Sequence, residues 1–154
     1  MTSATDRDAR ATVPAATMGS PRVRPPRRSV SRNIVGGFFL FTGAIHLAVV
    51  AVDPQIYGGF ADDGLFPFVR DGGQQIVMAA PAVYGLLLML GEITLGIALL
   101  VGGRAATFGW VGVIAFHVLL LPFGWGVWIW AIPALVVLVP LAVRDIRASK
   151  EVLP

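Results

Sequence analysis

Four long apolar segments constrain this chain more than any other feature of its sequence. They cover residues 34–52, 82–101, 105–121 and 127–143. Each is about 17–20 residues long, which at 1.5 Å per residue is enough to cross the roughly 30 Å of hydrocarbon in a bilayer. The sequence therefore predicts an all-α integral membrane protein, folded as a four-helix bundle.

The composition agrees with a membrane protein and excludes several kinds of chemistry. Hydrophobic residues make up 56% of the chain and charged residues 14%, whereas a soluble domain has about 25% charged residues. Cysteine is absent. This excludes disulfides, thiol relays and metal sites built from cysteine.

The distribution of basic residues predicts the orientation in the membrane. Seven of the twelve lysines and arginines precede residue 34, whereas residues 53–81 hold one arginine and four aspartates. Cationic residues stay on the cytoplasmic side, so both termini are expected there. This rule also explains the net charge of +3. Since the sequence has no nucleic-acid-binding motif, we expect membrane lipids, and not nucleic acid, as its partners.

The distribution of apolar and charged residues divides the chain into three parts. Residues 1–33 are rich in Ala, Pro and Arg and are expected to be a disordered basic cytoplasmic tail. Residues 34–143 form the membrane domain, and residues 144–154 a second cytoplasmic tail. Within the membrane domain, an outer loop at 53–81 carries several aromatic residues. Three arrangements stay open for it: it can lie on the membrane surface, cap the mouth of the bundle, or be a mixed loop with a few interfacial aromatics.

Three readily titratable side chains lie inside the predicted spans: His46, Glu92 and His117. An ionised group in hydrocarbon costs several kcal/mol unless it is paired or protonated, so each needs a partner. Measured along each span from its inner boundary, all three lie about 14–18 Å deep. We therefore expect the interior of the bundle to bring them together. Tyr84, near the outer entrance of the second span, is a further candidate for this pocket.

The residue types leave several functions open for this group. It can be a structural hydrogen-bonded network, which polar side chains often form in membranes. It can be a pocket for a quinone, with Glu92 and a histidine exchanging protons. His46 and His117 can be the axial ligands of a b-type haem, or ligands of a metal ion together with Glu92. A polar path for transport is the remaining alternative.

The segment around Glu92 resembles a known family. Residues 91–106, GEITLGIALLVGGRAA, combine a glutamate inside a helix, an aliphatic stretch with glycine and a short turn with arginine. Pro81 before this helix and the glycine-rich first span also fit. The pattern is similar to that of the DoxX-like family of small four-helix bacterial membrane proteins, and the resemblance covers roughly residues 34–143.

The resemblance implies a multi-pass protein of the bacterial inner membrane. It also implies a small accessory subunit of a redox or quinone-linked system, with other membrane subunits or copies of itself as partners. Glu92 is the one residue to which it gives a role. A non-catalytic structural or assembly subunit of a larger membrane complex is the alternative, and no catalytic residue follows from either function.

Overall fold

The computed structural model describes residues 29–150, which contain four long helices and no strand. Each of the four is long and apolar enough to cross a membrane, which confirms the predicted all-α membrane bundle. The rest of the expected N-terminal tail and the last four residues lie outside the described part. The long helices are α1 (Val30–Val52), α4 (Pro81–Val101), α5 (Gly103–Leu120) and α6 (Trp125–Lys150).

Two helices extend beyond the apolar segments. Helix α1 begins at Val30, where the side chain of Ser29 accepts a hydrogen bond from the backbone N–H of Arg32 at 3.4 Å. Helix α6 continues through the charged residues after position 143 to Lys150. The change from apolar to charged residues therefore marks the end of the apolar stretch and not the end of the helix.

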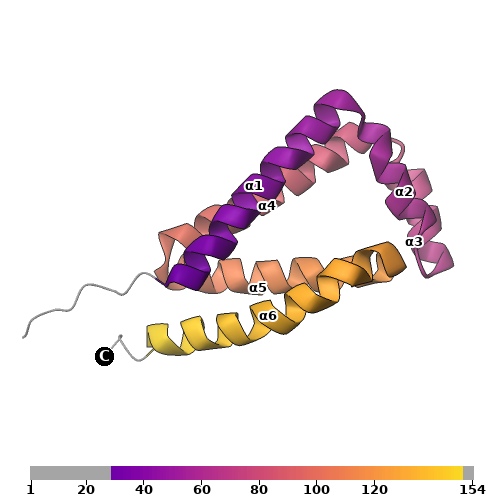
Figure 1. The fold of residues 1–154 in the computed structure, drawn as a ribbon. Coiled ribbons are helices and arrows are strands. Elements are labelled where there is room, and N and C mark those ends of the chain that lie inside the picture. Colours follow the sequence, from indigo (N-terminus) through magenta and orange to yellow (C-terminus); the bar gives the residue numbers. More distant parts are fainter. Residues whose placement is uncertain (1–28, 151–154) are drawn as a thin grey trace, which may run out of the picture.

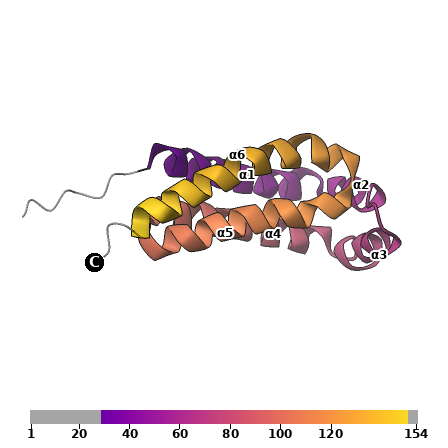
Figure 2. The ribbon, with the colours of Figure 1, turned by 90° about the horizontal axis from the view of Figure 1, so that it is seen from below.

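The long helices form two pairs that diverge. Helices α1 and α4 lie side by side, α5 and α6 form the second pair, and the two pairs make two layers (Figure 2). The pairs meet at the end of the bundle where the described chain begins and finishes, and they separate toward the other end (Figure 1). These are called the terminal end and the distal end below.

Glycines bring α1 and α4 into close contact. A Cβ atom on Gly96 would lie 2.8 Å from the carbonyl oxygen of Gly36, and one on Gly36 would lie 3.0 Å from that of Gly96. Small residues allow such close approach, and membrane helices gain van der Waals contact from it. This pair of helices is therefore held at short range along the face that also carries His46 and Glu92.

A polar cluster joins three helices at the terminal end. Trp110 of α5 is fully buried, and its Nε1–H donates a hydrogen bond to Oδ2 of Asp145 in α6 at 3.0 Å. Nη1 of Arg32 in α1 lies 3.7 Å from the same oxygen. Both charged side chains are mostly buried. The charges predicted to lie in two cytoplasmic tails thus meet inside the fold.

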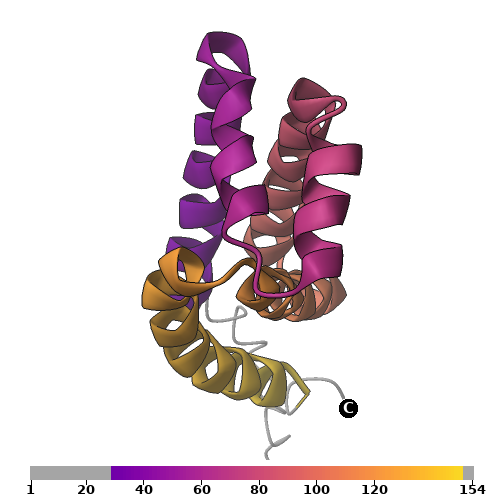
Figure 3. The same cartoon turned by 90° about the vertical axis from the view of Figure 1, so that its right-hand side faces the viewer.

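Residues 53–80 cross the distal end and are called the capping segment. Four short helices form it, and the backbone N–H of Leu65 donates to the carbonyl of Pro122, between α5 and α6, at 2.8 Å. Figure 3 shows this segment spanning from the first helix pair to the second. The segment thus covers the distal end of the bundle, as expected for a cap. Its helices are η1 (Pro54–Ile56), α2 (Tyr57–Asp62), α3 (Pro67–Gly72) and η2 (Gly73–Val77).

Helix α6 curves along its length, as Figure 3 shows. Pro133 and Pro140 lie inside it. Each proline removes a backbone hydrogen bond and its ring clashes with the preceding turn, which bends a helix. The curvature lets α6 start beside the capping segment and end against α1 and α5.

Candidate polar site inside the bundle

The structure brings His46 of α1 and Glu92 of α4 together. Nε2 of His46 lies 3.5 Å from Oε1 of Glu92. Glu92 is buried and His46 is half-buried. Gly43 makes this approach possible, because a Cβ atom there would lie 2.9 Å from the side chain of Ile93, the residue after Glu92. Close helix packing therefore sets the distance between the imidazole and the carboxyl group.

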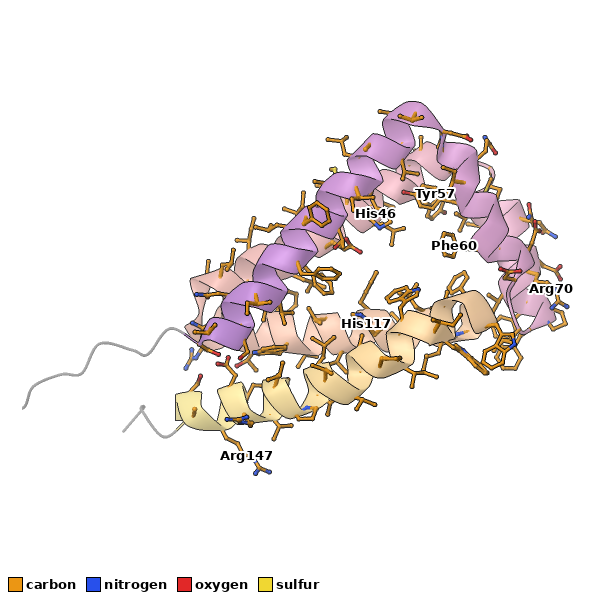
Figure 4. All side chains as sticks on the ribbon, in the orientation of Figure 1. His46, Tyr57, Phe60, Arg70, His117 and Arg147 are labelled. Carbon is orange, nitrogen blue, oxygen red and sulfur yellow. The ribbon has the colours of Figure 1, made fainter. Side chains whose placement is uncertain are left out.

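Tyr57 of the capping segment completes the site. Its hydroxyl lies 2.8 Å from Nδ1 of His46, and the two rings are stacked with centroids 5.8 Å apart. Figure 4 shows the two side chains next to each other on the inner side of α1. Gly85 of α4 leaves room for the phenol, since a Cβ atom there would lie 2.8 Å from the tyrosine oxygen. The site is thus built from three elements, α1, α2 and α4.

The sequence did not point to Tyr57, which appeared only as one of several aromatics in a loop. The one sequence feature that indicated space for a further side chain beside Glu92 was on α4. Gly85 and Glu92 are seven residues apart and share one helix face. A glycine on the face of a buried glutamate leaves space for a side chain from another element. The sequence did not show that this side chain comes from the capping segment.

The environment of Tyr57 favours the protonated phenol. Burial, and secondarily the negative charge of Glu92, raise the pKa of Tyr57 above its usual value of 10.0. The hydroxyl therefore keeps its proton at neutral pH, and it can donate this proton to Nδ1 of His46 or accept a hydrogen bond from Nδ1–H, according to the tautomer of the imidazole. A neutral imidazole that accepts at Nδ1 carries its hydrogen on Nε2, which faces Glu92. The Tyr57 hydroxyl, the His46 imidazole and the Glu92 carboxyl group can thus form one continuous chain of donors and acceptors.

One oxygen of Glu92 has unused hydrogen-bonding capacity. Oε2 is buried and has no hydrogen-bond partner within residues 29–149. Leaving a buried polar atom unpartnered costs about 1–3 kcal/mol, and more when the group is charged. Native structures seldom keep such an atom without a reason. Oε2 is therefore the atom of this site best placed to accept a hydrogen bond or a proton from a bound molecule.

His117 belongs to a different environment. It is buried on α5, and its Nδ1 donates to the carbonyl of Val113, one turn earlier, at 2.8 Å. The rings of Phe39, Phe116 and Trp130 surround it at centroid distances of 5.5–6.0 Å. In the described part of the chain, no hydrogen bond or ion pair links it to His46 or Glu92. The predicted group of three is therefore a pair and a separate histidine.

An apolar groove adjoins His117. Its volume is about 420 Å³, and it lies between α1 and α6, with His117 the one titratable residue in its wall. The other residues of its wall are apolar side chains of α1 and α6. The groove therefore adds nothing to the polar site of His46 and Glu92.

Tyr84 lies one turn into α4 and is half-buried. Its hydroxyl makes no hydrogen bond to any residue between 29 and 149. Thus, of the two tyrosines in the chain, the structure places Tyr57 in contact with His46. Tyr84 remains a candidate at the edge of the pocket.

The geometry also bears on haem and metal ions. Both ring nitrogens of His46 already face polar groups, Tyr57 and Glu92. Ligation of a haem iron by His46 and His117 would require His46 to give up one of these contacts. Over residues 29–149, no three His, Asp or Glu side chains lie close enough to hold a metal ion together. The donor set thus suits proton exchange better than metal coordination.

Comparison with known proteins found no match to any protein-family model, curated protein or solved structure.

Proposed function

We propose that this integral membrane protein is a small subunit of a quinone-linked redox system, in which Glu92 and His46 bind a quinone and exchange protons with it. The observation that supports this most is the unpartnered oxygen Oε2 of Glu92 beside a histidine. An acid and a base placed together in a low-dielectric interior are suited to proton transfer. A lipophilic molecule can reach such a site from the bilayer.

Each residue has a separate part in the proposed site. The quinone, when bound, supplies the redox chemistry and takes up protons as it is reduced. Glu92 would hold a proton on Oε2 and give it to a quinone oxygen as the quinone is reduced. His46 stabilises the carboxylate through Nε2, and Tyr57 fixes the tautomer of His46 by donating to Nδ1. Tyr57 therefore acts through His46 and is a positioning residue.

The resemblance of residues 91–106 to the DoxX-like family supports the same proposal. It would make the protein an accessory subunit in a bacterial inner membrane, with the terminal end cytoplasmic. The helices expose many large apolar side chains, which lipids, other subunits or further copies of the chain can cover. Electrons would come from a partner subunit, since the residues of the site carry no redox group of their own.

A structural or assembly subunit is the second candidate. Two sets of polar side chains that already have partners favour this structural function. His117 forms a hydrogen bond within its own helix, and the terminal cluster of Arg32, Trp110 and Asp145 joins three helices. Polar contacts of this kind fix the register of membrane helices. In that case Glu92 would contribute to stability or assembly and to nothing else.

The experiment that separates the two is native mass spectrometry of the protein extracted from its own membrane in mild detergent. Wild type is compared with Glu92→Gln, which keeps the shape of the side chain and removes its charge. Thr94→Val is the matched control, because Thr94 is an exposed residue of the same helix that bonds only to the carbonyl of Leu90.

The proposal expects a quinone mass on wild type and on the control, and its loss from Glu92→Gln while the protein stays folded. Retention of the same quinone by Glu92→Gln would overturn the proposed site. Subunit peaks without any quinone, lost only when Glu92→Gln unfolds the protein, would support the structural function instead.

A further inference from the structure

The distal end carries a second hollow that the polar site does not use. It has a volume of about 410 Å³ and is lined by Asp63, Leu65, Trp125 and Trp128. Asp63 and Leu65 belong to the capping segment, and the two tryptophans to the first turn of α6. One carboxylate and two indoles therefore face a single space at the membrane boundary.

Backbone contacts hold Asp63 beside the tryptophans. The N–H of Leu65 bonds to the carbonyl of Pro122 at 2.8 Å. Gly124, with a φ of +92°, packs against the carbonyl oxygen of Asp63 where any Cβ atom would collide. This left-handed conformation suits glycine. The backbone at Asp63 is thus fixed beside the tryptophans, and its side chain is exposed.

The two tryptophans form an aromatic corner. Their ring centroids are 5.5 Å apart at an interplanar angle of 75°. Nε1–H of Trp128 donates to the carbonyl of Leu121 at 2.8 Å, so this ring has no free donor and is held in place. Trp125 is 76% exposed. A fixed indole and an exposed one thus line the hollow, and the π-electron density of an indole ring attracts cations.

The charge of Asp63 distinguishes this corner from an ordinary interfacial tryptophan pair. The neighbouring Asp62 accepts a hydrogen bond from Gln74 at 2.7 Å. Asp63, by contrast, has no side-chain hydrogen bond or ion pair to any residue in the described range. The sequence between positions 53 and 81 also holds four aspartates and one arginine. The local potential therefore draws cations to this end of the bundle.

We infer that Asp63, Trp125 and Trp128 form a binding site for the ammonium group of an organic cation. The carboxylate supplies the opposite charge and the indoles supply cation–π contacts, a combination that is used to recognise quaternary ammonium groups. The hollow lies at the distal end, separate from Glu92, so this inference does not rest on the proposed quinone site. The ammonium group can belong to a free solute or to the headgroup of a lipid.

The test is a titration of the full-length protein in nanodiscs of phosphatidylglycerol with tetramethylammonium chloride, against sodium chloride at equal ionic strength. Tryptophan fluorescence is the measured signal. We expect a saturable change that Trp125→Ala abolishes and that Asp63→Asn weakens about tenfold in affinity. Asp62→Asn is the matched control, because it removes the same charge one residue away and should leave the affinity unchanged.

A second set of nanodiscs that contain phosphatidylcholine identifies the source of the ammonium group. Weaker apparent binding of tetramethylammonium in these discs shows that the lipid headgroup occupies the site, and unchanged binding shows a site for a free cation. The inference is overturned by the absence of any saturable change, by equal affinity of wild type and Asp63→Asn, or by an equal loss in Asp62→Asn and Asp63→Asn.

Discussion

The hydroxyl of Tyr57 lies 2.8 Å from Nδ1 of His46, and this side-chain contact links the capping segment to helix α1. His46 in turn faces Glu92 of α4. His46 therefore connects a residue of the cap to Glu92, which is the only carboxyl side chain in the four apolar segments of the sequence. The cap and the intramembrane site form one unit, so a change in either is expected to affect the other.

Tyr57→Phe should weaken this unit. The substitution removes the hydroxyl that forms a hydrogen bond with Nδ1 of His46 and keeps the ring stacked on the imidazole. We expect a loss of about 1 kcal/mol in the free energy of unfolding, the usual net value of such a bond. Thermal unfolding in detergent is the measurement. Tyr84→Phe is the control and should be neutral, since the Tyr84 hydroxyl has no bond to any described residue; an equal loss in both variants would contradict the assignment.

The raised pKa of Tyr57 predicts how stability depends on alkaline pH. Below pH 10.0 the phenol is protonated in both the folded and the unfolded chain, so its stabilising effect is fully present. Above that value the unfolded chain loses the proton first, and stability falls as the pH rises through the folded pKa. In Tyr84→Phe, Tyr57 is the remaining tyrosine. Its ultraviolet absorbance should titrate above pH 10.0, whereas titration at or below this value would refute the raised pKa.

Gly96→Ala should separate α1 from α4. The new methyl group would lie 2.8 Å from the carbonyl oxygen of Gly36, so one backbone must shift. Overpacking of this kind costs about 1–3 kcal/mol. Gly91→Ala is the control on the same helix, because nothing lies within 4 Å of its Cβ position. Unfolding in detergent should show a loss for Gly96→Ala alone, and comparable stability of the two variants would show that the helices do not pack as described.

Asp145→Ala should open the terminal end of the bundle. It removes the acceptor of the Trp110 indole and the partner of the Arg32 guanidinium. Breaking a mostly buried ion pair leaves an uncompensated charge, and we expect a loss of about 2–4 kcal/mol. Trp110 fluorescence should shift to the red as water reaches the ring. Arg147→Ala, an exposed residue one turn from Lys150 that points away from the bundle (Figure 4), should show neither change.

The sequence was sufficient for the membrane helices and insufficient for the contacts between them. Hydrophobic length alone located the four spans, because each must cross the hydrocarbon. Depth along the helices placed His46 and Glu92 in one layer. Depth does not determine which neighbour a side chain faces. His117, at a similar depth, is rotated toward Phe39 and Trp130.

The capping segment shows a second reason why the sequence predicted the membrane helices but not the contacts between them. Residues 53–80 have no continuous apolar or alternating pattern, so local sequence favoured a loop. Their helices are short, and their position depends on contacts with distant residues, such as Leu65 with Pro122 and Tyr57 with Gly85. Propensity does not report contacts between residues far apart in the chain. The role of Tyr57 therefore became visible only in the folded structure.

The measurement that tests the account most directly is an electrochemically driven infrared difference spectrum of the protein with a short-chain quinone. If Glu92 exchanges a proton with the quinone, reduction should change a carboxyl carbonyl band, and Glu92→Gln should remove that band while Tyr57→Phe shifts it. Identical difference spectra of wild type and Glu92→Gln would show that the carboxyl group takes no part, and would contradict the proposed function.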